Sequence, residues 1–283
     1  MRVGLHMPLK GGFSHNVNRA VGLGCRSLQI FIGSPKAWHL APPNEAELEQ
    51  RRRLLAEKSI YPLVIHSAYL VNLSSANEIF LRKSCELMQE TMKRAALIGA
   101  PYVVMHAGSH GGRGFDAGMK LFISMLKQEL KKWPPQVRLL LENTAGGGSS
   151  LGGKFAPLGQ ILKELGPNAP VGICLDTAHA WAAGYDLSSA EGTKKSMDEL
   201  FAAVGFERVM AIHANNIGSP RGAHRDRHVH LREGLIPPEA FSTLFSYPWP
   251  EELPVILESP EIGSHWDEIN LTDLRSYAAA GVS

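Results

Sequence analysis

The amino-acid sequence predicts a single barrel of eight parallel strands, each followed by a helix. Eight short apolar runs recur along the chain, and segments with helical periodicity separate them. Strands that are apolar along their whole length are typical of parallel sheets covered on both faces. The chain has 283 residues, which suits one α/β barrel domain of roughly 250 residues, here spanning 1–283. We therefore expect the (β/α)8 TIM-barrel class.

The eight expected strands share an unusual feature, because most of them stop on a polar residue. In chain order they are Val3–His6, Ser27–Phe31, Pro62–His66, Tyr102–His106, Val137–Glu142, Val171–Asp176, Val209–His213 and Pro254–Glu258. From the third onward each run ends on a histidine, an aspartate or a glutamate, and the first also ends on a histidine. The carboxyl ends of barrel strands form the face that carries the active site. The pattern therefore places candidate functional residues on that face.

Helical segments between these runs carry apolar residues at spacings of three and four. They are expected at Glu45–Glu57, Asn77–Leu97, Asp116–Lys132, Ala156–Leu165, Ser189–Val204, Pro238–Phe245 and Trp266–Ala280. The alternative architecture is an open doubly wound sheet, which would place a glycine-rich phosphate turn after the first strand. The residues after that strand contain no such fingerprint. The barrel is therefore the favoured interpretation.

The bulk composition is that of a globular protein without a membrane segment. Hydrophobic residues make up 44% and charged residues 20% of the chain, enough to build a core. No apolar run approaches the roughly 20 residues that cross a bilayer, and Met1–Gly4 leads directly into a strand without a signal peptide. Three cysteines without a CxxC pair favour a reducing compartment and exclude a structural thiolate zinc site. We expect a cytoplasmic protein with no membrane partner.

A basic segment lies between Ser219 and Arg232, although the net charge of the whole chain is only +2. The segment contains three histidines and four arginines but only one acid, Asp226. The arginines are Arg221, Arg225, Arg227 and Arg232. Beside metal-bearing strand ends, such a segment would attract a polyanion. A solvated surface loop is the alternative.

Nine side chains that can bind metal ions are expected to converge on the same face. Six stand at strand ends, and Asp176-Thr-Ala-His179 and Asp226-Arg-His228 add three more, giving His66, His106, Glu142, Asp176, His179, His213, Asp226, His228 and Glu258. A lone histidine is more often a satisfied interior residue than a ligand. Four buried carboxylates, however, need cations beside them. The set supports two or three ions, and mixed nitrogen and oxygen ligands suit zinc, manganese or iron.

With these residues in place, the chain resembles endonuclease IV, the metal-dependent apurinic/apyrimidinic endonuclease family of base excision repair. The resemblance runs from His6-Met-Pro-Leu-Lys-Gly-Gly12 to Leu257-Glu-Ser-Pro260. Its most specific stretches are Met105–His110, Leu141–Gly146, Cys174–Asp186 and Asp226–His228. The resemblance implies a TIM barrel of the xylose isomerase-like type.

The same resemblance implies three Zn²⁺ ions per chain, with Mn²⁺ or Fe²⁺ as alternatives at some sites. Glu142 would bridge two ions, and the three ligand sets would be His66 and His106, then Asp176, His213 and Glu258, then His179, Asp226 and His228. The implied reaction is hydrolysis of the phosphodiester 5′ of an abasic site in double-stranded DNA. It leaves a 3′-hydroxyl and a 5′-deoxyribose phosphate. Glu142 and Glu258 would be the catalytic residues, with Glu258 also orienting the nucleophile.

Family members fill the gap in the base stack with an aromatic and aliphatic pair after the third strand, where Tyr69 and Leu70 stand here. Local packing is the alternative role for these two residues. The family's arginine after the second strand is Lys36, and Arg225 and Arg227 complete the expected DNA contacts.

Two departures from the family pattern are Asn216, in place of an acid, and Arg232, in place of a glycine. Asn216 stands where a residue could orient a metal ligand, so its exchange could alter metal affinity. Arg232 could change contacts with the DNA backbone. We expect a monomer without an obligate protein partner, since no apolar surface stripe stands out.

Two other functions remain open at this level. A sugar isomerase or epimerase on the same barrel would bind one metal through Glu142, Asp176, His213 and Glu258. It would leave the other five candidate ligands without a role, so the number of bound ions separates it from a nuclease. A non-catalytic binder of damaged DNA is the second alternative, although a binder does not need nine ligands.

Overall fold

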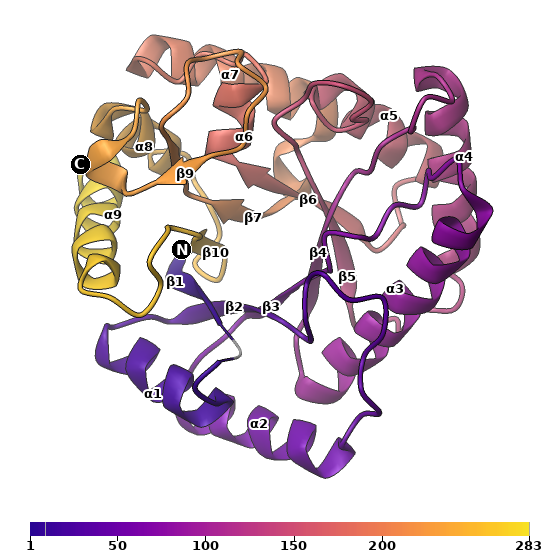
Figure 1. The fold of residues 1–283 in the computed structure, drawn as a ribbon. Coiled ribbons are helices and arrows are strands. Elements are labelled where there is room, and N and C mark those ends of the chain that lie inside the picture. The colour runs from indigo at the N-terminus through magenta and orange to yellow at the C-terminus, as the bar shows by residue number, and fades with distance from the viewer. Residues whose placement is uncertain (9, 283) are drawn as a thin grey trace.

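The computed structural model describes residues 1–8 and 10–282 and has a closed barrel of parallel strands at its centre (Figure 1). The barrel strands are β1 (Arg2–Met7), β2 (Ser27–Phe31), β3 (Leu63–His66), β4 (Tyr102–His106), β5 (Arg138–Glu142), β6 (Val171–Asp176), β7 (Val209–His213) and β10 (Pro254–Leu257). They follow one another around the barrel in chain order, and β1 pairs with both β2 and β10 to close it. The predicted barrel class is confirmed.

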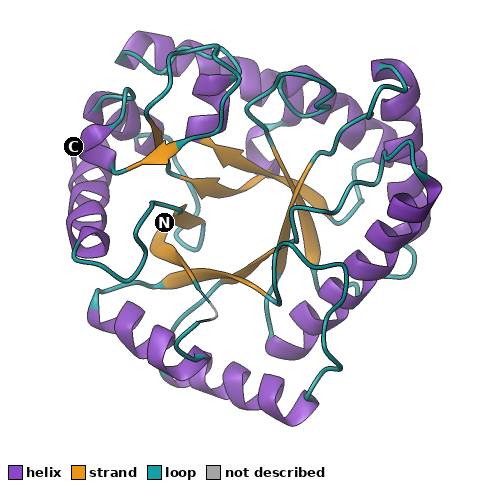
Figure 2. Cartoon of the chain, viewed as in Figure 1, coloured by secondary structure: helices purple, strands orange, loops and turns teal. Residues whose placement is uncertain are grey.

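Helices surround the strands as an outer ring (Figure 2). They are α1 (Phe13–Gly22), α2 (Glu45–Glu57), α3 (Glu78–Ile98), α4 (Phe115–Glu129), α5 (Phe155–Leu165), α7 (Ala190–Val204), α8 (Pro238–Phe245) and α9 (Trp266–Val282). The sequence pattern had not delimited α1, which buries only Asn16, Val17 and Ala20. Within the described residues, no helix is long and apolar enough to cross a membrane.

Three short elements lie beyond the ends of β6 and β7 and were not expected from the sequence. The helix α6 (Thr177–Ala182) follows β6 directly, and β8 (Asn216–Ile217) pairs antiparallel with β9 (His228–Val229). The 3₁₀ turn Leu231–Glu233 completes this region. These elements extend the rim of the barrel on the side where the strands end. A second 3₁₀ turn, Phe206–Arg208, directly precedes β7 and therefore lies at the opposite end of the barrel.

Side chains alternate along each barrel strand between the helix layer and the barrel interior, as the pleat of a strand requires. A small interior cluster, separate from the main core between strands and helices, consists of Val64, Val104, Leu140, Cys174 and Ala211. The residues two positions further along these strands are His66, His106, Glu142, Asp176 and His213. The candidate ligands therefore point into the barrel and lie one layer above an apolar floor.

Candidate metal centre

The structure brings all nine predicted ligands to one end of the barrel. Their outer layer helps to line a cavity of about 780 Å³ and consists of His66, His106, His179, Asp226, His228 and Glu258. Beneath it, the side chains of Glu142, Asp176 and His213 are completely buried. Three overlapping groups with mutually close ligand atoms can be distinguished within the nine.

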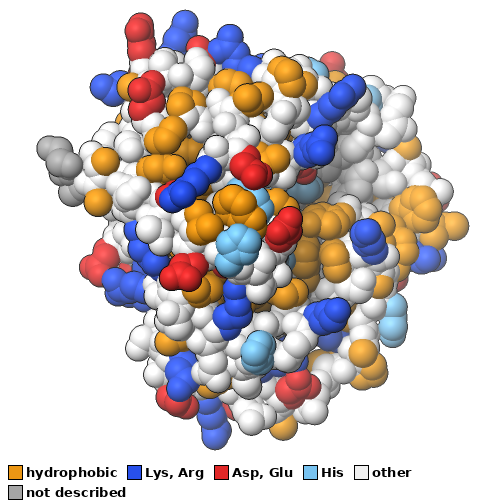
Figure 3. All heavy atoms as spheres, turned by 60° about the vertical axis from the view of Figure 1, so that its left-hand side comes forward, with side chains coloured by type: hydrophobic (Ala, Val, Ile, Leu, Met, Phe, Trp, Pro, Cys, Tyr) orange, Lys and Arg blue, Asp and Glu red, His pale blue; other side chains and the backbone are white. Residues whose placement is uncertain are grey.

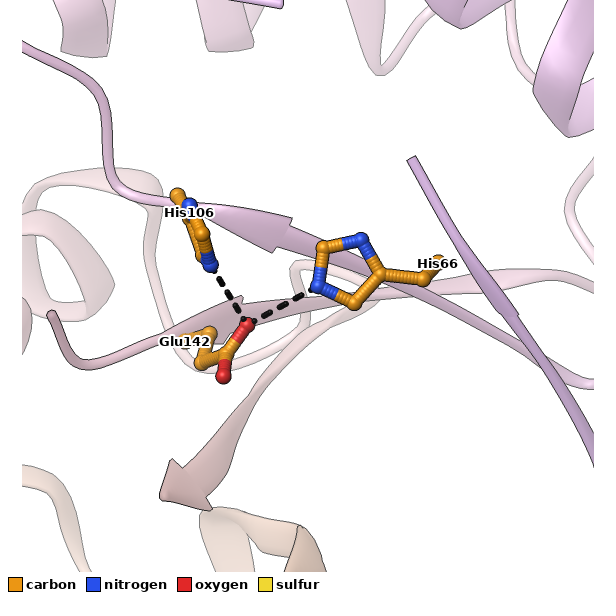
Figure 4. Close-up of side chains that lie close together, drawn as sticks. All are labelled: His66, His106 and Glu142. Carbon is orange, nitrogen blue, oxygen red and sulfur yellow. Dashed lines mark hydrogen bonds and ion pairs between the residues drawn. The ribbon is translucent and has the colours of Figure 1, made fainter. Parts of the chain in front are cut away.

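The first group joins the ends of β3, β4 and β5 (Figure 4). Both histidine rings point at the same carboxylate oxygen, since Oε2 of Glu142 lies 3.2 Å from Nε2 of His66 and 3.1 Å from Nε2 of His106. Glu142 is completely buried, so bulk solvent does not reach its carboxylate. The second oxygen of Glu142 is left free to serve the neighbouring group.

The second group centres on His213 and shares Glu142 with the first. Nδ1 of His213 lies 3.0 Å from Oε1 of Glu142 and 3.3 Å from Oε2 of Glu258. Oδ2 of Asp176 is 3.8 Å from the same nitrogen. One imidazole therefore faces three carboxylates across a small space.

The third group consists of Asp176, His179 and His228, and its two histidines lie in the short elements at the rim of the barrel. Asp226 lies between two histidines, with Oδ2 3.1 Å from Nε2 of His179 and Oδ1 3.1 Å from Nε2 of His228. Asp176 also approaches, with Oδ2 3.9 Å from Nε2 of His228. The predicted alternation of Asp226, Arg227 and His228 therefore brings the two outer side chains together, while Arg227 is exposed.

Backbone carbonyls fix the orientation of several rings. Nδ1 lies 2.7 Å from Ser67 O in His66, 2.9 Å from Asn143 O in His179 and 3.2 Å from Glu258 O in His228. Since a carbonyl oxygen only accepts hydrogen bonds, each Nδ1 carries the proton. In the neutral ring Nε2 then keeps a lone pair, which is the form a metal requires.

The pKa values of the carboxyl groups in the cluster are shifted in different directions. Burial would raise the pKa of Glu142 and Glu258, but His213 and other nearby histidines hold the pKa of both carboxyl groups well below the usual range. Burial also acts on Asp226, whose pKa is nevertheless low because His179 and His228 lie beside it. Asp176 differs, since burial is the larger effect and raises its pKa.

The histidines compensate this negative charge. Burial opposes protonation, but Asp176, Asp226 and Glu142 together keep the pKa of His179 well above its ordinary value. Burial also lowers the pKa of His228, but the nearby carboxylates of Asp226 and Asp176 outweigh this effect and raise the pKa to about 9. In the metal-free protein, protons on these rings therefore supply positive charge that cations could supply instead.

The donor set fits divalent metal ions. Two ligands of one tetrahedral zinc ion lie about 3.3 Å apart when each metal–ligand bond is 2.0–2.1 Å. The nitrogen–oxygen pairs of the first two groups lie between 3.0 and 3.3 Å apart, Asp176 excepted. In addition, Nε2 of His228 is buried and makes no hydrogen bond to any described residue, despite its proximity to Asp226. An ion between the two residues would satisfy both.

Comparisons with known proteins agree with this geometry. The family model described as a xylose isomerase-like TIM barrel matches residues 17–277. A probable endonuclease 4 from Natranaerobius thermophilus is 39% identical over 277 residues, which are 97% of each chain. Another, from Solibacter usitatus, is 38% identical over 284 residues and is matched over 98% of its length. The chain belongs to the endonuclease IV family.

A solved structure supports the same family. Endonuclease IV from Thermus thermophilus superposes with a TM-score of 0.85 at 34% identity, covering 99% of both chains. A D-tagatose 3-epimerase-like protein superposes with a TM-score of 0.77 at only 18% identity, which shows a common fold alone. The predicted family and the predicted barrel type are both confirmed.

Beside the nine candidate ligands, the structure adds Asn215, Gln29 and His6 to the site. Asn215 donates through Nδ2 to Asp176 Oδ2 at 2.6 Å and to Glu258 Oε2 at 3.1 Å. Gln29 and His6 lie against Glu258 from the other side. The sequence contained a signal for two of these three residues. Gln29 is a polar residue within an apolar strand, and His6 stands at the end of the first expected strand, as the candidate ligands stand at the ends of theirs.

Of the two departures from the endonuclease IV pattern, Asn216 does not make the expected contact with a candidate ligand, and Arg232 pairs with an acid of α9. Asn216 hydrogen-bonds to the backbone of Ile217, Leu231 and Ile236, and it orients a loop rather than a candidate ligand. Arg232 forms two hydrogen bonds with Asp273 of α9, at 2.6 and 2.8 Å. The residue that orients the carboxylates is the neighbouring Asn215.

The predicted DNA contacts are placed unevenly. Tyr69 lines the cavity and its side chain is exposed, whereas Leu70 is half-buried and Lys36 is exposed nearby without lining the cavity. Arg225 and Arg227 are exposed and form no ion pair with a described residue, in contrast to Arg221, which pairs with Asp186. Cations and anions are interspersed on the face in Figure 3, in keeping with the small net charge.

Proposed function

We propose that this protein is an apurinic/apyrimidinic endonuclease that holds three zinc ions and hydrolyses the phosphodiester 5′ of an abasic site in double-stranded DNA. The products are a 3′-hydroxyl and a 5′-deoxyribose phosphate. Family membership supports the reaction class, and the observation that carries the proposal is the overlap of three ligand groups in one cavity. We expect the enzyme to act as a cytoplasmic monomer.

The ligand sets follow the three groups, with Asp226 added to the third because it lies beside both of that group's histidines. The first ion would be held by His66, His106 and Glu142, and the second by Glu142, Asp176, His213 and Glu258. The third would be held by His179, His228 and Asp226, with Asp176 close enough to contribute. When bound, these ions would neutralise the buried acids, attract an anionic phosphodiester and activate water. Manganese or iron at some positions would supply the same chemistry.

Glu258 is the ligand best placed to act on water as well. It lines the cavity, in contrast to the buried Glu142, and its low pKa keeps it ionised at neutral pH. One of its oxygens faces His213 and Asn215, and the other faces Gln29. A carboxylate held from both sides can accept a hydrogen bond from an attacking water and so orient it.

The walls of the cavity suit an extruded deoxyribose. Phe31 and Tyr69 are in edge contact, with ring centroids 5.3 Å apart, and Ile262 also lines the cavity. An abasic sugar lacks a base, so its removal from the stack costs little and leaves a gap for a protein side chain. Tyr69 would fill that gap together with Leu70, while Lys36, Arg225 and Arg227 would bind backbone phosphates.

The alternatives receive less support. A single-metal isomerase would use Glu142, Asp176, His213 and Glu258, which leaves the five other groups unexplained although they contact the same cluster. The similarity to epimerase structures lies below 25% identity and concerns the fold. A non-catalytic binder would not need buried ligands in three overlapping groups.

A nicking assay decides among these functions. Zinc-loaded protein, with its metal content measured, is incubated with a duplex that carries one tetrahydrofuran abasic analogue, with and without chelator. We expect three ions per chain, a single cut 5′ of the analogue, and no cut after chelation or in the undamaged duplex. Binding without a cut by fully loaded protein would favour the binder, and one ion per chain without a cut would favour the isomerase.

A further inference from the structure

Gln29 occupies a central position among the ligands, although it cannot be charged. It stands in β2 and is completely buried. Its amide contacts three site residues: Nε2 lies 2.6 Å from Oε1 of Glu258 and 2.9 Å from Nδ1 of His6, and Oε1 lies 2.8 Å from Nε2 of His213. One side chain therefore connects two candidate ligands with a histidine of the cavity wall.

The contact with Glu258 determines which way the amide faces. An ionised carboxylate only accepts hydrogen bonds, so the group 2.6 Å from Oε1 of Glu258 must be the amide nitrogen. A reversed amide would place two acceptor oxygens against each other in a buried site, which is costly. The amide oxygen of Gln29 must then face His213.

The tautomer of His213 follows from this orientation. The amide oxygen has no proton to give, so Nε2 of His213 must carry one and donate it. The other nitrogen, Nδ1, is the one that faces Glu142, Asp176 and Glu258. In the neutral ring Nδ1 is thus the atom with the free lone pair, as a metal ligand requires.

His6 is oriented by the second hydrogen of the same amide group. Nδ1 of His6 lies 2.9 Å from the amide nitrogen of Gln29, which can only donate, and 3.4 Å from Oε1 of Glu258. The shorter contact makes Nδ1 an acceptor, so the proton of the neutral ring lies on Nε2. No described residue pairs with Nε2 of His6, and the ring lines the cavity. An N–H group beside Glu258 is thus available to an anionic substrate.

We propose that Gln29 is a positioning residue that sets the tautomers of His213 and His6, presenting Nδ1 of His213 to the second metal ion and the Nε2–H group of His6 to the substrate. The role of His213 as a ligand rests on the proposed function. Gln29 itself belongs to none of the three ligand groups and acts on them through its hydrogen bonds.

The test compares Gln29→Met with Ser27→Ala. Methionine preserves the size of the side chain but removes all three hydrogen bonds. Ser27 is also buried in β2, two positions earlier, and bonds to Arg2 O away from the site, so it is a matched control. Zinc content and affinity are measured by chelator competition, and thermal unfolding of the metal-free proteins reports on the fold.

In Gln29→Met we expect one ion of the three to bind about 10- to 100-fold more weakly, the range for residues that orient a metal ligand. The other two ions, and all three in Ser27→Ala, should keep the affinity of the unmodified protein. The turnover number should fall more than the KM rises. Three ions with unchanged affinity in Gln29→Met would overturn the proposal while leaving the nuclease function intact.

A second measurement needs no variant. Long-range ¹⁵N–¹H NMR spectra of the zinc-loaded, unmodified protein should show His213 protonated at Nε2 and bound to metal through Nδ1. Coordination through Nε2 would refute the role of Gln29 even if Gln29→Met does not fold. Fewer than three ions in the unmodified protein would instead count against the proposed function.

Discussion

The two parts of the metal centre are built in different ways. The deep part consists of Glu142, Asp176 and His213, which stand at the ends of strands and are completely buried. The outer part depends on Asp226, whose side chain is 51% exposed, and on His228 in the two-residue strand β9. Strand ends in a closed barrel cannot move independently, whereas a loop can open. The deep ligands are therefore more firmly preorganised than Asp226 and His228, although a backbone carbonyl orients the ring of His228.

The loop that carries the outer part is tied to α6 through few bonds. Trp181 donates to Ser219 O at 3.0 Å, and the backbone N–H groups of Gly222 and His224 donate to carbonyls of α6 at 3.1 and 3.0 Å. Asp226 and His228 are thus carried by a segment that is held mainly by hydrogen bonds at the rim of the barrel, away from the buried ligands. We infer that the third ion is the first to leave when metal is limiting.

Loss of the shared carboxylate should have the largest effect. Glu142→Gln removes a ligand from both deep ions at once, so we expect nicking of abasic DNA to fall by at least about 10³-fold. The buried Glu129, which bonds to Lys132 and Gln89 outside the site, provides the control Glu129→Gln. Single-turnover rates and zinc content are compared in both variants. Near-normal nicking by Glu142→Gln would show that the deep part is not the catalytic core.

Loss of the exposed carboxylate should be less severe and more selective. Asp226→Asn weakens only the third group, so we expect about a 10²-fold slower reaction and a protein that retains two ions. Asp186→Asn, an exposed acid paired with Arg221, is the control. Zinc is counted by elemental analysis after brief dialysis against chelator. If all three ions leave together, the deep and the outer parts bind metal as one cooperative unit, and the outer part is not the weaker one.

The pH dependence of metal binding should distinguish the two parts as well. The pKa of His228 is raised to about 9 in the metal-free protein, so its ring is protonated at neutral pH and must release a proton to bind an ion. Below pH 9 the affinity of the third site should therefore fall by at least about tenfold for each pH unit, because the proton of His228, and that of His179 wherever this ring is also protonated, competes with the metal. Chelator competition at pH 6, 7 and 8 measures this slope. Affinity independent of pH would remove His228 from the ligand set.

The smallest expected effect concerns the cavity wall. Tyr69→Ala should weaken binding of abasic DNA by about tenfold, because stacking on a base contributes roughly 1–3 kcal/mol, while the rate of cutting bound DNA changes less. Tyr61, an exposed tyrosine beside Pro62 at the start of β3 and therefore at the opposite end of the strands, gives the control Tyr61→Ala. Single-turnover rates at saturating enzyme separate the two quantities. Slower cutting with unchanged binding would instead place Tyr69 in the chemistry.

The deep part of the site was predictable because its signal is regular. An apolar run that ends on His66, Glu142 or Asp176 predicts a strand. It also predicts the face on which the last side chain lies, since parallel barrel strands all end on one face. The predicted strands differ from the observed ones by a residue or two at their ends, as at β1 and β5. The helix α1 was not delimited because its 10 residues bury only three side chains.

The outer part and the supporting residues could be predicted only in part. The pair β8 and β9 has two residues in each strand, too few for any periodicity to show. Asn215 contacts Asp176, which is 39 residues away in the sequence, and Gln29 contacts His213, which is 184 residues away. A local sequence pattern does not reveal contacts between residues so far apart. Asn216 was assigned a role near the ligands because of its place in the chain, but its side chain faces the loop instead.

The alternation along the barrel strands has a consequence for how such a protein can change over generations. Each ligand points inward, while the residues on either side of it, such as Ile65 and Met105, face the helices and hold the barrel together. Mutation can therefore exchange the ring of donors without disturbing the surrounding shell. One scaffold could acquire a new chemistry by editing a single inward layer.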